Sequence, residues 1–144
     1  MLYIASDHAG FPLKEELKKY LSGLGIGFED LGASQLELGD DYPDFAAALA
    51  QKVSGKDENK GILICGTGQG MCLAANKFKG IRAALAHDEF TALAAIEHLN
   101  ANILCLGARV TNPETAKKLM KIWLEAEFSG DERHKRRLEK IEKL

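Results

Sequence analysis

A thiol followed by alternating glycines is the part of this sequence best suited to chemistry. Cys65 closes the apolar run 62–64, and glycines occupy alternate positions from 66 to 70. The apolar run predicts a buried parallel strand, and the residues from 71 to 77 predict a helix. Glycines between a strand and a helix leave backbone N–H groups free to approach an anion closely. We therefore predict that this loop cradles a negatively charged group beside the thiol.

The loop taken alone has ordinary explanations. A cysteine at a strand end is most often a small buried hydrophobic residue. The glycine spacing is not the dinucleotide-binding fingerprint, because Met71 stands where the last glycine is needed. It is not a P-loop either, because Thr67 stands at the lysine position. Such glycines also serve tight turns, so other residues must corroborate a site.

The apolar pattern predicts alternating strands and helices. Strands are predicted over 2–6, 26–31, 62–65, 81–86 and 101–106, and helices over 11–24, 44–53 with Asp44 as the cap, 71–77, 89–99, 111–128 and 131–144. Short connections between such elements are typical of a parallel sheet with helices on both faces. We predict one α/β domain over residues 1–144, a Rossmann-like three-layer sandwich with a five-stranded parallel sheet. The strand order stays open.

The carboxyl ends of parallel strands share one edge of a sheet, so the residues that follow the strands are expected to meet there. Asp7 and His8 follow the first strand, and Arg109 follows the fifth. His98 precedes the fifth strand, and the topology alone would leave it further from this edge. A carboxylate, an imidazole and a guanidinium beside Cys65 predict a candidate active-site cleft.

The C-terminal helix offers two more cations. Arg133 and Arg137 are four residues apart and share a helix face, where two guanidinium groups can grip a phosphate. The alternative is a solvated, salt-bridged tail, because glutamates are interspersed among the basic residues. From the residues alone, the solvated tail is the favoured interpretation.

The composition argues against several classes of protein, namely nucleic-acid-binding, membrane and disulfide-rich proteins. The net charge is −2, so no overall field recruits nucleic acid or an anionic membrane. The N-terminal apolar run is too short for a signal peptide, and no segment has the length of a membrane span. The odd count of 3 cysteines argues against a disulfide framework, and Cys72 and Cys105 are expected to be core thiols. We expect a cytoplasmic location.

Several blocks in order along the chain resemble the type B ribose-5-phosphate isomerases, in the wider family that includes galactose-6-phosphate isomerase. The matching blocks are 6–10, 41–44, 61–70, 74–77, 80–83, 100–104, 107–109 and 133–134. The resemblance implies an aldose–ketose isomerase that interconverts ribose 5-phosphate and ribulose 5-phosphate through an enediolate, without a metal or another cofactor. It also implies a homodimer, or possible pairs of dimers, with clefts at the subunit interface and with the helix 131–144 packed on the partner.

The matching positions carry the family's site residues onto this chain. Cys65 would be the base that moves a proton between C1 and C2, a step that needs a base near neutrality. His98, with Asp7, would open the sugar ring, and His8 and Arg109 would hold the phosphate. The resemblance completes the site with Thr67 and the amides of Gly66, Gly68 and Gly70 at the enediolate, Asn100 at the substrate, and Arg133 and Arg137 from the partner subunit.

The chain departs from the family pattern at two places. Leu99 stands where the family usually carries asparagine, and the loop 33–40 is longer than expected. Some relatives use a glutamate base at the position of Met71, which groups this chain with the cysteine-using branch. The departures leave an isomerase of allose 6-phosphate or galactose 6-phosphate as the alternative. A non-catalytic nucleotide-binding or signalling module is a further alternative, although a receiver domain would need an aspartate at Cys65.

Overall fold

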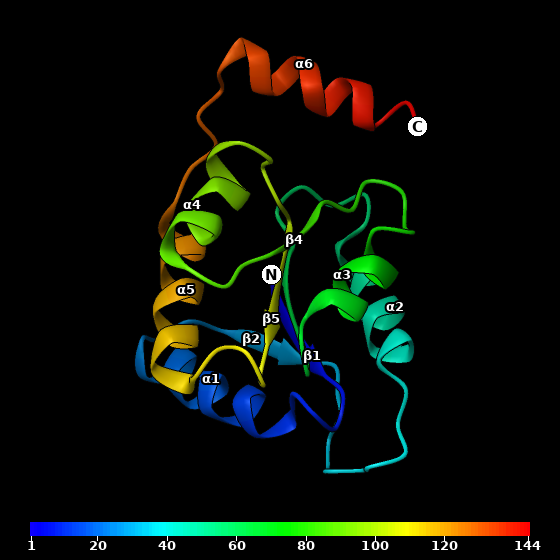
Figure 1. The fold of residues 1–144 in the computed structure, drawn as a ribbon, viewed down its shortest axis with the longest axis vertical. Helices are drawn as coiled ribbons and strands as arrows, with labels where there is room; N and C mark the ends of the chain where they lie inside the picture. Colours follow the sequence, from blue (N-terminus) through cyan, green and yellow to red (C-terminus); the bar gives the residue numbers. More distant parts are fainter.

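A five-stranded parallel sheet forms the middle layer of the computed structural model, which describes all of residues 1–144 (Figure 1). The strand order is β2-β1-β3-β5-β4. The strands are β1 (Leu2–Ser6), β2 (Phe28–Asp30), β3 (Lys60–Cys65), β4 (Ala83–Leu85) and β5 (Ile103–Gly107). The central strands are the longest and are buried on both faces, as parallel strands between two helical layers must be.

Five helices cover the two faces of the sheet. They are α1 (Phe11–Gly23), α4 (Glu89–Glu97) and α5 (Pro113–Glu125) on one face, and α2 (Tyr42–Val53) and α3 (Gln69–Ala75) on the other (Figure 1). The predicted single-domain, three-layer α/β fold is confirmed. No helix combines the length and apolar character that crossing a membrane requires.

Two hydrophobic cores separate the layers. Leu13, Leu17 and Leu21 of α1 recur at helical spacing and pack into the core that also contains the fully buried Trp123. The opposite core joins Leu49 of α2 to the other face of the sheet. Burial of these side chains, each contributing about 1.5 to 3 kcal/mol, fixes the strands whose ends carry the candidate site.

Most helices begin or end a few residues from the predicted boundaries, and two of these differences have clear local reasons. The second helix begins at Tyr42, so Asp44 lies in its first turn and does not cap it. Pro43 in that first turn favours the earlier start. The third helix ends at Ala75, because both amide atoms of Asn76 bond the backbone of Ala83 at 2.9 Å and tie the helix end to β4.

A crevice is expected where neighbouring strands send their connections to opposite faces, and β1 and β3 meet that condition. The strand β1 leads into α1 on one face, and β3 leads into α3 on the other. Ser6 pairs with Ile64, so Asp7 and Cys65 emerge at the same edge of the sheet.

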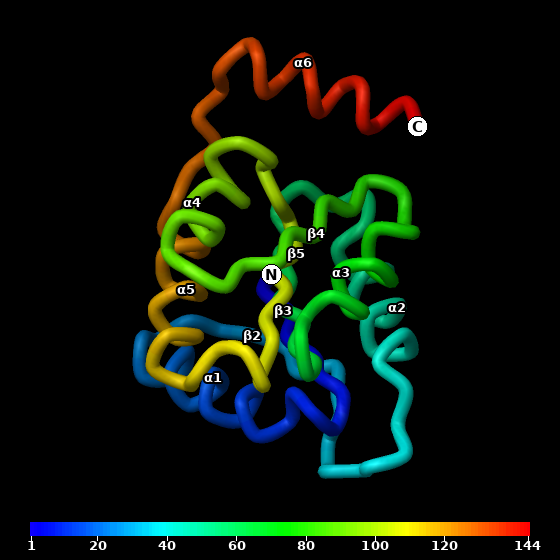
Figure 2. Tube along the Cα trace, in the orientation of Figure 1, coloured from blue at the N-terminus to red at the C-terminus, as the bar shows by residue number.

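The last helix, α6 (Glu132–Ile141), lies apart from the layers, beyond the amino ends of the strands (Figure 2). His134 is its only buried residue. An ion pair of 3.3 Å between Arg82 and Glu142, just beyond the helix, also ties this segment to the body. The predicted C-terminal helix is confirmed, although it spans a shorter stretch than expected.

Candidate active site

Cys65 is the last residue of β3 and lies at the carboxyl edge of the sheet with only 4% of its surface exposed. Its Sγ accepts a hydrogen bond of 3.1 Å from the backbone N–H of Gly68. Gly68 has φ of +78°, and a Cβ there would lie 2.5 Å from Leu85 and 2.9 Å from the carbonyl carbon of Leu106. Because only glycine fits this conformation and this space, the loop is held in the shape that brings an N–H to the thiol.

Arg109 places a cation over the same loop. The backbone N–H of Arg109 donates to the carbonyl of Gly66 at 2.9 Å, and that of Ala108 donates to the carbonyl of Cys65 at 2.8 Å. The guanidinium lies close above Gly66, where a Cβ would be 3.1 Å from Nη1. The guanidinium forms no ion pair within the chain, so its charge is available to an anion.

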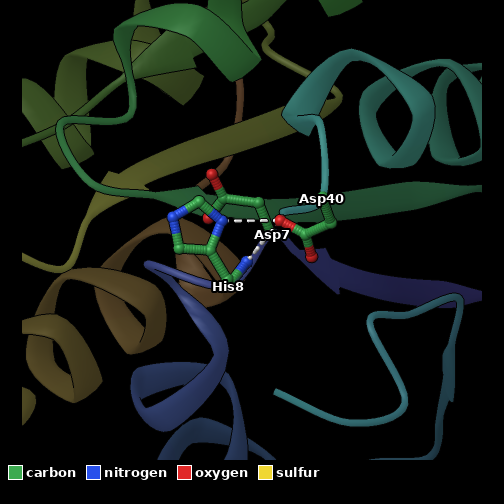
Figure 3. A group of neighbouring side chains, drawn as sticks. All are labelled: Asp7, His8 and Asp40. Carbon is green, nitrogen blue, oxygen red and sulfur yellow. Dashed lines mark hydrogen bonds and ion pairs between the residues drawn. The ribbon is translucent and has the colours of Figure 1, made fainter. Parts of the chain in front are cut away.

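Asp7 and His8 lie beside this loop, and a third residue joins them (Figure 3). Oδ1 of Asp7 accepts the N–H of Gly10 at 3.0 Å, which fixes the turn into α1. Oδ1 of Asp40 lies 2.6 Å from Nδ1 of His8 and 3.0 Å from the backbone nitrogen of His8. The ligand atoms of these three residues lie within 4.8 Å of one another, but hydrogen bonds account for their arrangement without an ion.

Asp40 was not predicted as a site residue. It lies 32 residues from His8 in the loop before α2, and no spacing connects the two. The only available signal was its place in a polar loop that leads back to the carboxyl edge.

Thr67 is exposed at the tip of the glycine loop, and its Oγ1 accepts the N–H of Gln69 at 3.4 Å. A cavity of about 290 Å³ adjoins it, with His87 and Gly107 in its lining. Gly70 packs against Tyr42, whose ring would lie 2.6 Å from a Cβ at that position. The structure therefore brings together Cys65 and the sequence-predicted loop residues at one edge.

The remaining predicted residues lie at the opposite edge of the sheet. Gly107, at the carboxyl end of β5, pairs with Cys65, whereas His98 precedes the amino end of the same strand. The four steps along β5 alone correspond to about 13 Å. A single chain therefore does not bring His98 to the thiol.

His98 has its own neighbours at that amino edge. Its ring stacks on His134 of α6 with centroids 4.4 Å apart. Asn100 has φ of +46°, and its carbonyl accepts Nε of Arg82 at 3.0 Å. Burial lowers the pKa of His134, and the His98 ring lowers it further. His134 is thus held toward its neutral form.

The two arginines of α6 lie on the exposed part of this edge. Arg133 is 62% exposed in its side chain and lies 3.7 Å from Asp131, and Arg137 is exposed without an ion pair. A second cavity of about 290 Å³ lies between α6 and β4, lined mostly by apolar residues such as Leu99, Leu138 and Ile141. Its apolar lining does not suit a sugar phosphate, and it shows that Leu138 and Ile141 lie on the side of α6 toward the body.

The other two cysteines lie behind Cys65. Cys105 is fully buried, as predicted, and Cys72 is partly exposed. A hydrogen bond from the Cys105 thiol lowers the pKa of Cys72 to about 7, and the same contact, with burial, raises the pKa of Cys105 well above its usual value. Cys105 therefore remains a protonated core thiol.

Comparisons with known proteins agree with this geometry. The family model described as Ribose/Galactose Isomerase matches residues 2–141. A crystal structure of ribose-5-phosphate isomerase B from Mycoplasma genitalium with bound ribulose 5-phosphate is 45% identical, with a TM-score of 0.94 over 99% of this chain and 93% of that chain.

Curated relatives extend the comparison. Ribose-5-phosphate isomerase B of Escherichia coli is 42% identical over 94% of this chain and 89% of its own length. D-erythrulose-4-phosphate isomerase of Pectobacterium atrosepticum is also 42% identical, over 88% of this chain and 84% of its own length. The chain belongs to the ribose/galactose isomerase family.

Proposed function

We propose that this chain interconverts ribose 5-phosphate and ribulose 5-phosphate. The observation that carries the proposal is the Cys65 thiol at the carboxyl edge of β3, where β1 and β3 send their connections to opposite faces, with the N–H of Gly68 bonded to its sulfur. The ribulose 5-phosphate bound to the Mycoplasma genitalium relative supports the choice of substrate.

Cys65 is the base in this proposal. The thiolate removes the proton from C2 of the open-chain aldose, and the C–H electron pair moves toward C1 as the carbonyl oxygen becomes an enediolate oxygen. The thiol then returns the proton to C1 while the hydroxyl proton of O2 passes to O1, so that O2 becomes the C2 carbonyl and O1 becomes a hydroxyl. Backbone N–H groups of residues 66–70 and the Thr67 hydroxyl donate to the substrate oxygens on which negative charge develops as the enediolate forms.

Phosphate binding falls to the cations at the same edge. The free guanidinium of Arg109 and the ring of His8 lie on either side of the glycine loop, on residues that follow β5 and β1. A guanidinium pairs with phosphate oxygens through two parallel hydrogen bonds. Asp7 remains a candidate partner of His98 in ring opening.

A second copy of the chain completes the site in this proposal. His98, Asn100, Arg133 and Arg137 lie at the amino edge, so a two-fold related copy is needed to carry them to Cys65. Large apolar side chains exposed on the helices and loops around β4 support such an interface, since monomers rarely leave many exposed together. They are Leu73, Phe90, Leu99, Val110 and Ile141.

We propose that the reaction needs no metal and no other cofactor. Proton transfer by Cys65, together with charge stabilisation by N–H groups and arginines, supplies the chemistry that an enediolate intermediate requires. The three free cysteines suit a reducing, cytoplasmic compartment.

The test is turnover of ribose 5-phosphate by chelator-treated wild type, Cys65→Ala and Cys72→Ala. Loss of the base is expected to lower kcat by about 10² to 10⁴. Cys72→Ala, the matched control, removes a nearby thiol and should keep most of the activity. Undiminished turnover by folded Cys65→Ala would overturn the cysteine base.

The choice of substrate is tested in the same assay with other sugar phosphates. D-erythrulose 4-phosphate, the substrate in one relative's name, is compared with allose 6-phosphate and galactose 6-phosphate. Exclusive turnover of one of these would keep the mechanism and replace the pentose phosphate. No turnover of any sugar phosphate would favour a binding module.

A further inference from the structure

We propose that Asp40 is a positioning residue, whose carboxylate holds the ring of His8 so that Nε2 faces the substrate phosphate. This inference rests on the proposed role of His8 in phosphate binding. It assigns a function to a residue in the loop 33–40, where the chain departs from the family pattern.

One oxygen of Asp40 holds His8 at two points (Figure 3). Oδ1 accepts the backbone N–H of His8 at 3.0 Å and lies 2.6 Å from Nδ1. Because an ionised carboxylate only accepts hydrogen bonds, Nδ1 carries the shared proton and Nε2 is the nitrogen left for a ligand. The two contacts fix both the position of the residue and the orientation of its ring.

The burial of Asp40 favours this contact over solvation. The Asp40 side chain is 9% exposed, and its Oδ2 has no hydrogen-bond partner. A buried carboxylate gains little from water, so loss of the His8 contacts would leave it poorly compensated. The His8 side chain is 28% exposed, which leaves part of the ring accessible.

The loop that carries Asp40 is anchored to the end of β1. The N–H of Ser6 donates to Gly32 and the N–H of Ala33 donates to Ser6, each at 2.7 Å. The fully buried Lys14 donates to the carbonyl of Ala33 and to Asp30. These bonds fix the start of the loop beside His8. Asp7, the other nearby carboxylate, is bonded to Gly10 and does not hold the His8 ring.

The pairing has a consequence for phosphate binding. Donation of Nδ1–H to Asp40 and of Nε2–H to phosphate at the same time requires a ring that carries both protons and a positive charge. Asp40 balances that charge. Asparagine at position 40 keeps an acceptor oxygen and loses the charge, whereas alanine loses both, so the two substitutions separate geometry from charge.

The kinetic experiment measures KM for ribose 5-phosphate, kcat, and the inhibition constant of inorganic phosphate. Asp40→Ala should raise KM and the inhibition constant about tenfold, the size of one charge-assisted hydrogen bond, with kcat changed less than twofold. Asp40→Asn should have a smaller effect. Glu37→Gln removes an exposed negative charge from the same loop and should match wild type.

A double-mutant cycle tests whether Asp40 acts through His8. Asp40→Ala combined with His8→Ala should weaken phosphate binding no more than His8→Ala alone. The proposal would be overturned if the effects of the two single substitutions on phosphate binding multiplied in the double variant. A fall in kcat with KM unchanged would also overturn it.

A readout that does not depend on the reaction separates this inference from the proposed function. Nitrogen-15 NMR of the His8 ring, assigned by its absence in His8→Ala, should show a protonated Nδ1 in wild type and mixed tautomers of the neutral ring in Asp40→Ala. An unchanged ring in Asp40→Ala would overturn the positioning role even in an active enzyme. Absent turnover with the expected NMR change would overturn only the isomerase assignment.

Discussion

The two edges of the sheet differ in how their polar side chains are held. At the carboxyl edge, Cys65, Asp7 and Asp40 are nearly buried and are hydrogen-bonded within the chain. At the amino edge, Arg133 and Arg137 are exposed on α6, a helix with a single buried residue. One edge has a thiol and hydrogen-bond donors in fixed geometry, and the other has two exposed guanidinium groups, of which only that of Arg133 has a carboxylate partner.

Under the proposed mechanism, neither edge is a complete site. A base and its N–H donors can move a proton but hold a doubly charged phosphate weakly with few cations. The exposed arginines can hold phosphate, and the imidazoles beside them, His98 and His134, lie far from the thiol. Variants that damage one edge at a time test whether the two edges of different copies work together.

The largest effect is expected from truncation after Ser129, which removes α6 and both of its arginines. Each charge-assisted hydrogen bond to phosphate is worth about 1.5 to 3 kcal/mol, so kcat/KM should fall at least about a hundredfold. Circular dichroism should show a folded core, because the two hydrophobic clusters contain no residue of α6. Full activity would place the whole site within residues 1–129.

Mixing two variants, each damaged at one edge, tests whether a site uses residues from both subunits. Cys65→Ala and Arg137→Ala damage opposite edges, so a mixed dimer has one intact site and one doubly damaged site. Random exchange of equal amounts should restore about a quarter of wild-type activity, since half of the dimers are mixed. Refolding the two variants together, followed by an assay, measures the gain. Activity equal to the mean of the separate variants would show that each chain works alone.

Alanine substitution of two glycines with positive φ, one at each edge, compares how tightly the two edges are packed. Gly68→Ala should lower the free energy of unfolding by about 3 kcal/mol or more, because a strained φ adds to overlap with Leu85 and Leu106. Gly130→Ala, where the nearest atom is 3.9 Å from the new Cβ, should cost only about 1 kcal/mol. Urea denaturation compares the two. Equal losses would contradict a tightly packed carboxyl edge.

The smallest effect concerns pH at the amino edge. The pKa of His134 is lowered from 6.5 by burial and by His98, with Arg133 and Arg137 acting in the same direction and Asp131 opposing. The unfolded state therefore binds the proton first as pH falls below about 6.5, and stability declines there. Between pH 7.5 and pH 5, the midpoint temperature of thermal unfolding should fall less in His134→Gln than in wild type. Identical slopes would rule out His134 as the cause.

The sequence predicted the elements with regular apolar spacing and the reactive residues that directly follow strands. The strand β1 and the helix α1 follow directly from apolar spacing, and the residues after β1, β3 and β5 reach one edge because parallel strands end together. Family membership, expected from the matching blocks, is confirmed. The roles of the individual site residues stay predictions.

Other features depend on contacts that spacing does not encode. The strand order depends on which face each helix covers, which the pattern left open. The Asp40–His8 pair depends on the path of a polar loop, and the end of α3 depends on the bonds between Asn76 and Ala83. Such long-range polar contacts leave no periodic trace in a single sequence.

The outer strands have a consequence for solubility. β2 and β4, at the two open edges, are only three residues long, whereas the inner strands have five or six. An open edge exposes unpaired backbone groups that invite another strand, and shortness limits how many bonds such an intruder can make. Pairing of sheets edge to edge between copies of this chain would therefore form few hydrogen bonds, which disfavours growth into fibres.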